Sequence, residues 1–227
     1  MALDGAAVPL SGARADLTVS RLADQLTPLY PTNLLRRHLP DMEETNRQLT
    51  ALIKSIEASE PNADAGTTTE GGYQTSAELL KRDHPALNIL KTHIGESVQA
   101  YANILIRQEC SVQPSRVEFV MWGWAVVLRA GNTQGLHVHP EANISGVYYV
   151  SAPPAALQRG DAGKISFYDP RPRANMNQLV RQITRHRESP VPGDLILFPS
   201  WLEHSVAAFD GPGERICVAF NARLIMS

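Results

Sequence analysis

The stretch Gly131-Asn-Thr-Gln-Gly-Leu-His-Val-His-Pro-Glu141 determines how the rest of the chain is interpreted. It places His137, His139 and Glu141 at every second position, directly after a long apolar run. If this stretch is a β-strand, alternate side chains point to one face, so these three side chains lie together. Imidazole and carboxylate groups are ligands that divalent transition metals use. A further histidine, His204, stands in a second strand-like segment, and we expect the downstream half of the chain to close a barrel around a metal site.

The composition is ordinary for a soluble globular protein. The chain has 227 residues, of which 43% are hydrophobic and 19% are charged, and this length suits one domain with a helical extension. The net charge of −2 gives neither a basic footprint for nucleic acid nor a polybasic membrane patch. The N-terminus lacks the features of a signal peptide, and no apolar run is long enough to span a bilayer. The 2 cysteines lie far apart without a CxxC pair, which fits a reducing compartment, so we expect a cytoplasmic protein.

The spacing of apolar residues divides the chain into a helical part and a β part. Residues 1–25 are rich in small residues without any period, so we expect a loose N-terminal segment. Residues 26–227 are expected to form one domain, with a helical part at 26–112 and a β-rich core at 113–227.

Two helices are predicted in the helical part. Asp41 and Glu44 have the spacing of a capping box, and a helix is expected from there to about residue 58. A second helix opens at Asp83-His84-Pro85, followed by an apolar stripe that runs to Leu105. The polar, Gly-rich stretch 59–75 between them is predicted to be a long loop and a candidate cover for an active site.

From about residue 115 the apolar pattern becomes that of β-strands. Val117–Leu128 is almost continuously apolar, as expected for a strand buried on both faces. A polar excursion at 170–190 interrupts the later strands. Short strands joined by Gly, Pro and Asn turns predict an antiparallel sandwich or barrel, with the helices packed on the outside of one sheet. The further strands are expected at 136–141, 144–151, 163–169, 194–199, a short segment from His204, and 214–224.

Two known patterns overlap at the histidines, and the first is that of the cupins. Gly131 followed by His-x-His resembles the start of the first cupin motif, and Gly193 with Pro199 and His204 resembles the second. The glutamate of the first motif is missing at its expected place, because Glu141 comes too early.

The second pattern is that of the Fe(II)/2-oxoglutarate-dependent oxygenases, which add an anchor for their cosubstrate. Arg215 follows His204 in the next strand-like run and shares a strand face with Cys217, Ala219 and Asn221. A buried arginine needs an anionic partner. A planar guanidinium suits the distal carboxylate of 2-oxoglutarate in a bidentate pair. The cupin pattern does not demand this arginine.

Longer segments carry a resemblance to one family. HVHPEANISGVYYVSAPP, GKISFYDPR, PVPGDLILFPSWLEHSV and ERICVAFNARL resemble the 2OG-Fe(II) oxygenases of bacteria and phages. The resemblance implies a double-stranded β-helix (jelly roll), mainly β with α, whose N-terminal helices pack on one sheet. It also implies an Fe(II) site, with 2-oxoglutarate as cosubstrate and molecular oxygen as oxidant. The expected reaction is hydroxylation coupled to decarboxylation of 2-oxoglutarate. The sequence does not identify the substrate, a small molecule or a peptide, and leaves the oligomeric state open, a homodimer included.

Two sets of iron ligands are open. One is His137, His139 and His204; the other replaces His137 by Glu141 and gives the more usual two-histidine, one-carboxylate triad. We favour the three histidines because the resemblance stresses both members of His-x-His. No catalytic residue beyond the metal ligands is assigned.

Arg215 is the residue expected to bind the cosubstrate. Ser145, Tyr148 and Ser166 are candidates for hydrogen bonds to it, as is Cys217 with less support. The alternatives are a cupin dioxygenase that does not use oxoglutarate and a cupin-like binding module for a metal or small molecule. Arg215 favours the oxygenase over both.

Overall fold

The computed structural model describes residues 27, 29–63, 68–109, 117–157, 160–173, 176 and 184–225. Contacts divide the chain into two units, Met1–Thr32 and Asn33–Ser227, and every element described below belongs to the second. The domain boundaries predicted at residues 25 and 112 stay predictions. No helix in the described ranges is long and apolar enough to cross a membrane.

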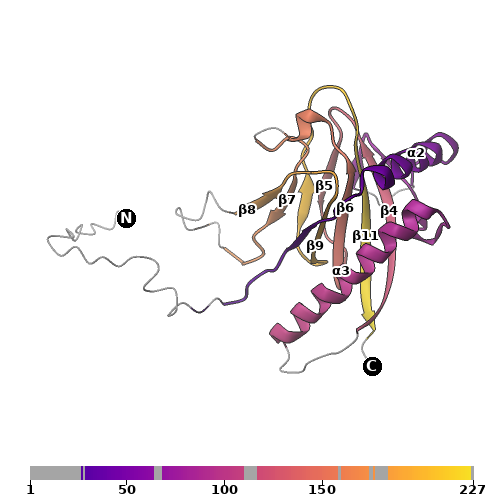
Figure 1. The fold of residues 1–227 in the computed structure, drawn as a ribbon. Helices are drawn as coiled ribbons and strands as arrows, with labels where there is room; N and C mark the ends of the chain where they lie inside the picture. The colour runs from indigo at the N-terminus through magenta and orange to yellow at the C-terminus, as the bar shows by residue number, and fades with distance from the viewer. Residues whose placement is uncertain are drawn as a thin grey trace, which may run out of the picture. The chain divides into compact units, whose positions relative to one another are not determined.

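The second unit is built of two antiparallel β-sheets and two long helices (Figure 1). The six-stranded sheet has the order β1-β9-β6-β11-β4-β3, and the five-stranded sheet has the order β2-β5-β10-β7-β8. This is the predicted double-stranded β-helix with α-helical additions. Its elements are β1 (Leu35–His38), α2 (Glu43–Ser59), β2 (Thr69–Glu70), β3 (Tyr73–Gln74), η2 (Leu79–Lys81), α3 (Pro85–Glu109), β4 (Glu118–Leu128), β5 (Thr133–His137), β6 (Ile144–Ser151), η3 (Pro154–Leu157), β7 (Ile165–Tyr168), β8 (Arg185–Glu188), β9 (Asp194–Pro199), β10 (His204–Val206) and β11 (Arg215–Ile225).

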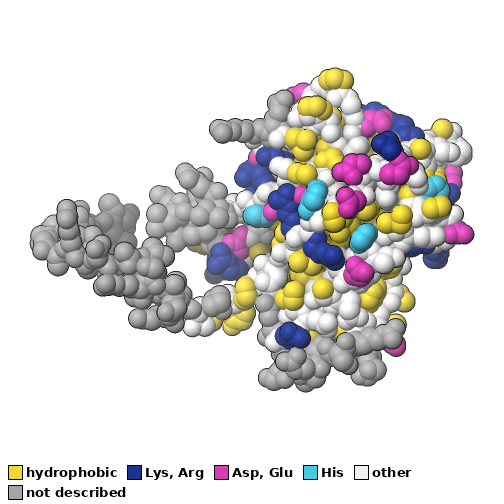
Figure 2. Space-filling view, viewed as in Figure 1, with side chains coloured by type: hydrophobic (Ala, Val, Ile, Leu, Met, Phe, Trp, Pro, Cys, Tyr) yellow, Lys and Arg dark blue, Asp and Glu magenta, His cyan; other side chains and the backbone are white. Residues whose placement is uncertain are grey.

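The described residues form two apolar cores, one on each face of the six-stranded sheet. Both helices pack on the outer face of this sheet, as predicted, and bury their apolar stripes there; Leu49 of α2 and Leu90 of α3 have no exposed surface. The second core lies between the sheets and contains Val126, Phe167 and Phe198. Burial of this apolar surface is the main stabilising contribution, at about 25 cal/mol per Å² removed from water. Basic and acidic side chains are interspersed over the face seen in Figure 2.

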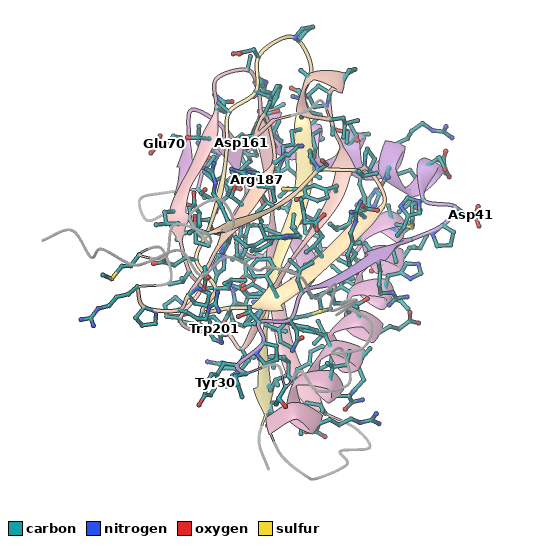
Figure 3. All side chains as sticks on the ribbon, turned by 90° about the vertical axis from the view of Figure 1, so that its left-hand side faces the viewer. Tyr30, Asp41, Glu70, Asp161, Arg187 and Trp201 are labelled. Atoms are coloured by element: carbon teal, nitrogen blue, oxygen red, sulfur yellow. The ribbon has the colours of Figure 1, made fainter. Side chains whose placement is uncertain are left out.

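The start of α2 differs from the prediction. Met42, not Asp41, precedes the first helical residue, and no side chain caps the helix. Asp41, labelled in Figure 3, lies one residue too early. It has a left-handed φ of 57°, and the capping box does not form. Glu44 instead accepts a hydrogen bond from Gln48 at 2.8 Å. The helix forms all the same because its buried apolar stripe outweighs one missing cap.

Strand β4 is buried over only part of its length, whereas burial on both faces was predicted. Residues from Ala125 to Leu128 have no exposed surface, but Glu118 is exposed. The first half of β4 pairs with the end of β11, where Ile225 is 49% exposed. The apolar run therefore includes residues that lie outside both cores.

Two stretches predicted to be loops contribute strands. In the stretch 59–75, β2 pairs with β5 and β3 pairs with β4. In the stretch 170–190, β8 pairs with β7 at the edge of the five-stranded sheet. Both additions are short and polar, so they lack the apolar alternation that reveals a strand in a sequence. Residues 64–67, 174–175 and 177–183 of these stretches lie outside the described residues.

Candidate metal centre and cosubstrate pocket

Strand pairing brings together two histidines that are far apart in the sequence. β5 and β10 are antiparallel neighbours, and His137 lies directly opposite His204 in their register. Their ring centroids are 4.1 Å apart. His204 is 4% exposed and packs against Phe198, whose ring centroid lies 4.8 Å from its own.

His139 reaches the same place by a route that the sequence did not predict. β5 ends at His137, so the alternation of one long strand does not position His139. The backbone N–H of His139 donates instead to the carbonyl of Ser200, at 2.9 Å, which fixes the segment beyond the strand. The centroid of its ring lies 5.0 Å from that of His137 and 5.2 Å from that of His204.

The three histidines form a group that could hold a metal ion. Their ligand atoms all lie within 4.8 Å of one another. Glu141 is not a member of this group, since it is exposed in the turn that follows the histidines. The structure thus brings His137, His139 and His204 together and leaves Glu141 apart.

The protonation of the histidines also suits a metal. Burial lowers the pKa of all three, to about 4 for His139 and about 3 for His204, and the neighbouring His137 adds to the effect at both. They are therefore neutral at pH 7. Nδ1 of His137 lies 2.7 Å from the carbonyl oxygen of Gly135, and Nδ1 of His204 lies 2.8 Å from that of Leu202. A carbonyl can only accept, so Nδ1 carries the proton and Nε2 keeps the lone pair for a metal.

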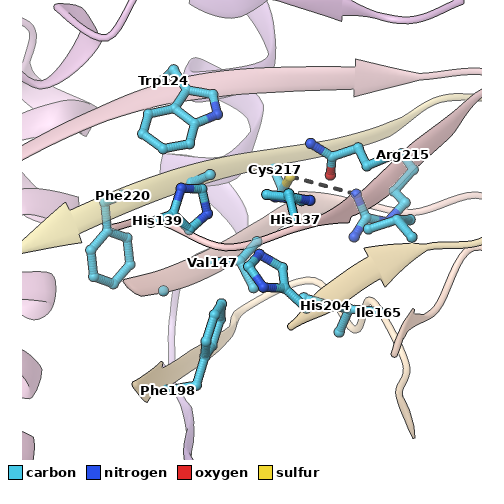
Figure 4. Close-up of a pocket in the computed structure, with 14 residues that line it drawn as sticks. Trp124, His137, His139, Val147, Ile165, Phe198, His204, Arg215, Cys217 and Phe220 are labelled. Atoms are coloured by element: carbon cyan, nitrogen blue, oxygen red, sulfur yellow. Dashed lines mark hydrogen bonds between the residues drawn. The ribbon is translucent and has the colours of Figure 1, made fainter. Parts of the chain in front are cut away.

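The histidines and Arg215 line one pocket between the two sheets (Figure 4). About 400 Å³ of this space is not filled by atoms. Phe220 also lines it, although it belongs, like Ile216 and Val218, to the core on the helix side. Its ring passes over Gly146, where a Cβ would lie only 2.2 Å from the ring atom Cζ.

Arg215 is a buried cation in this pocket, with 1% of its surface exposed. Its Nε donates to the carbonyl of Gly163 at 3.0 Å, and its Nη1 lies 3.5 Å from Sγ of Cys217. The guanidinium carbon lies 5.1 Å from the centre of the Tyr149 ring. In the part of the chain that the structure describes, no carboxylate forms an ion pair with Arg215. Of the four residues predicted to share a strand face, Arg215, Cys217 and Ala219 line the pocket, whereas Asn221 does not.

The three polar candidates for cosubstrate binding do not line the pocket. Ser145 donates to Oδ1 of Asn221 at 2.7 Å, and Tyr148 donates to Oδ1 of Asn46 on α2. Ser166 is buried, outside the pocket lining.

Tyr149 was missed by the sequence analysis, although it stands next to a candidate. Its hydroxyl is buried, and no described group hydrogen-bonds to it. Burial raises its pKa, so the phenol stays protonated and can donate. Neighbouring residues of a strand point to opposite faces, and a strand that is apolar on both faces gives no signal to tell them apart.

Comparisons with known proteins agree with this geometry. Residues 121–221 match the model of the family described as "Putative 2OG-Fe(II) oxygenase". No curated protein matches the sequence. A Pseudomonas putida prolyl-4-hydroxylase is similar in structure, with a TM-score of 0.57 and 16% identity over 91% of this chain and 97% of that one. A Trichoplax adhaerens prolyl hydroxylase in complex with a peptide fragment of hypoxia inducible factor gives a TM-score of 0.58 and 12% identity over 92% and 88%.

A third similar structure is HygX from Streptomyces hygroscopicus, with nickel and 2-oxoglutarate bound. Its TM-score is 0.52, with 15% identity over 85% of this chain and 83% of that one. At such identities the likeness shows the fold, and it confirms the predicted double-stranded β-helix. The family model matches the part of the chain from β4 to β11, which carries the pocket. Over these residues the chain is similar to the 2OG-Fe(II) oxygenases, a family of oxidoreductases whose metal is Fe(II) and whose cosubstrate is 2-oxoglutarate, and its three histidines could hold such a metal.

Proposed function

We propose that the chain is a hydroxylase in which His137, His139 and His204 hold Fe(II) and Arg215 binds the distal carboxylate of 2-oxoglutarate. One observation carries the proposal: a buried guanidinium without a carboxylate partner among the described residues lines the same pocket as three neutral imidazoles. A small dianion that also chelates a metal satisfies both ends of this pocket.

The three histidines would supply neutral nitrogen ligands and leave coordination positions free for the cosubstrate and oxygen. When bound, Fe(II) supplies the redox chemistry by which molecular oxygen converts 2-oxoglutarate to succinate and carbon dioxide and hydroxylates the substrate. The carbonyls of Gly135 and Leu202 orient the rings of His137 and His204 and keep Nε2 unprotonated. Because the pKa values of His139 and His204 are about 4 and 3, protons compete little with the metal at neutral pH.

Arg215 would hold the far end of the cosubstrate. A bidentate pair with a carboxylate compensates the buried positive charge and is favoured where water is excluded. Gly163 and Tyr149 keep the guanidinium in place from two sides. The unpartnered hydroxyl of Tyr149 supplies a further donor close to Arg215, so the carboxylate would receive hydrogen bonds from both side chains.

Formation of succinate from 2-oxoglutarate tests the proposal. The protein, Fe(II) and 2-oxoglutarate are incubated in air, and succinate is measured by mass spectrometry. Turnover of the cosubstrate is expected even without the true substrate. His204→Ala should abolish it, whereas His186→Ala, which changes an exposed histidine on β8, should not. Equal succinate formation by wild type and His204→Ala would refute the assignment of His204 as an iron ligand. Oxidation of a substrate by the iron-loaded protein without 2-oxoglutarate would favour a cupin dioxygenase instead.

A further inference from the structure

A second hollow opens beside the metal centre, and it contains about 560 Å³ of space not filled by atoms. It shares Trp124, Gln134, His137 and His139 with the inner pocket. Its remaining walls come from β3 and from the segments next to β2 and β5. A substrate has to come close to the metal, so under the proposed function this hollow is where the substrate lies.

Two glutamine side chains that line the hollow, Gln74 and Gln134, are joined through Thr69, which lies outside the lining. Nε2 of Gln134 donates to Oγ1 of Thr69 at 3.3 Å, and Oγ1 of Thr69 donates to Oε1 of Gln74 at 3.0 Å. A hydroxyl has a single proton, so this chain of hydrogen bonds runs in one direction and fixes the orientation of both amides. Among the described residues, Oε1 of Gln134 then has no hydrogen-bond donor and the Nε2 group of Gln74 has no acceptor.

The described walls of the hollow carry no fixed charge. Besides the shared residues they consist of Thr68, Gln74 and Val138, so no acidic, lysine or arginine side chain contributes. A carboxylate or ammonium group placed there would lose hydration without gaining a counter-ion. The acidic side chain of β2, Glu70, is exposed and accepts a hydrogen bond from the hydroxyl of Thr133 at 3.1 Å.

Trp124 gives the hollow a broad apolar wall. Its ring centroid lies 5.7 Å from that of His139, so the indole stands beside the metal centre. Aromatic side chains bury large apolar areas and stack on flat groups. The wall therefore suits a flat, uncharged group better than a hydrated one.

We propose that this hollow binds an uncharged carboxamide group of the substrate, with Gln74 donating to its carbonyl oxygen and Gln134 accepting from its N–H. The group lies against Trp124 and next to the metal centre. Its source is either the backbone of a peptide or the amide of a small molecule, because both have the same donor and acceptor. The inference rests on the proposed function for the role of the bound molecule as substrate.

The test is direct binding to the metal-free protein, observed by NMR at the side-chain NH₂ signals of Gln74 and Gln134. These signals are assigned by their loss in Gln74→Glu and Gln134→Glu. The probes are propanamide, the capped peptide acetyl-Ala-Ala-Ala-amide, and propanoate as the charged control of the same size as propanamide. We expect a saturable shift of both signals with at least one amide and none with propanoate at equal millimolar concentration. A shift with the peptide alone assigns a peptide source, and a shift with propanamide alone assigns a small molecule.

Substitution of one glutamine supplies a second measurement. Gln74→Glu removes the donor and adds a charge, so we expect amide binding, followed at the signals of Gln134, to weaken by about tenfold or more. Gln48→Glu on the exposed face of α2 is the matched control and should leave binding unchanged. Propanoate binding as strongly as propanamide would overturn the inference, as would amides that leave both signals unmoved. Because no metal or 2-oxoglutarate is added, these results are independent of succinate formation, and either proposal can fail without the other.

Discussion

Replacement of Arg215 by methionine separates a structural role of this residue from binding of the cosubstrate. Methionine keeps most of the length and apolar contact of the side chain but removes the charge. If Arg215 exists to bind an anion, Arg215→Met removes a charge whose burial is unfavourable in the metal-free, cosubstrate-free protein. The free energy of unfolding of that state should therefore change little, while most of the stabilisation by 2-oxoglutarate is lost.

The size of the effect follows from the contacts of Arg215. Its hydrogen bond to Gly163 contributes about 1.5–3 kcal/mol, and its contact with the Tyr149 ring contributes up to about 2 kcal/mol. Burial of the unpaired charge costs several kcal/mol, so these contributions nearly cancel. We expect the free energy of unfolding of Arg215→Met to lie within about 2 kcal/mol of the wild-type value. By contrast, 2-oxoglutarate at 100 times its wild-type dissociation constant should stabilise the wild type by about 2.7 kcal/mol, and the variant, which binds it about 100-fold more weakly, by only about 0.4 kcal/mol.

Urea denaturation measures both quantities. Unfolding is followed by circular dichroism without ligand, and then with Mn(II) and 2-oxoglutarate in the absence of oxygen. Arg47→Met, which changes an exposed arginine on α2, is the matched control. Two results together would refute the anchor assignment. One is a loss of about 3–5 kcal/mol in the free energy of unfolding of ligand-free Arg215→Met, as when one partner of a buried ion pair is removed. The other is stabilisation of this variant by 2-oxoglutarate equal to that of the wild type.

Three further predictions concern the histidines and the packing beside them. His204→Ala should abolish binding of one equivalent of Fe(II) or Mn(II) in calorimetry, whereas His186→Ala should retain it; retention by both would exclude His204 as a ligand. The folded-state pKa of His204, about 3, lies below the value of about 6.5 in the unfolded chain, so the unfolded state takes up a proton first and stability falls as pH drops. Between pH 7 and pH 5, protonation of this group in the unfolded state should lower the free energy of unfolding of the metal-free protein by about 2 kcal/mol. In urea denaturation at both pH values, the free energy of unfolding of His204→Asn should fall by about 2 kcal/mol less than that of the wild type. Gly146→Ala should lower the free energy of unfolding by about 1–3 kcal/mol, because the added Cβ would meet the ring of Phe220. A variant with the same thermal unfolding temperature as the wild type would contradict this packing.

The sequence contained enough information for the core strands and, together with the family resemblance, for the choice of the three histidines over Glu141. The core strands are long apolar runs bounded by turn residues, and such runs predict strands wherever both faces are buried. His-x-His, a distal histidine and a later arginine stand at spacings that an antiparallel pair can close. In the structure, antiparallel pairing of β5 with β10 closes this spacing and sets His137 opposite His204.

The remaining features depend on contacts between distant segments. His139 lies beyond the end of its strand and is positioned by the carbonyl of Ser200, which strand alternation cannot predict. Tyr149 rather than Tyr148 faces Arg215, because the register of β6 and β11 decides which side of an apolar strand is turned inward. The strands β2 and β3 form only because β5 and β4 offer free edges, and this is a property of the assembled sheets.

Anaerobic absorption spectroscopy tests most directly whether one pocket holds iron and 2-oxoglutarate together. Fe(II) and 2-oxoglutarate are added to the protein separately and then together, and the visible spectrum is recorded. The proposed site predicts a weak metal-to-ligand charge-transfer band that requires both additions, is absent in His204→Ala and needs about 100-fold more 2-oxoglutarate in Arg215→Met. A band of unchanged strength and affinity in both variants, or no band in a wild type shown by calorimetry to bind both, would contradict the site.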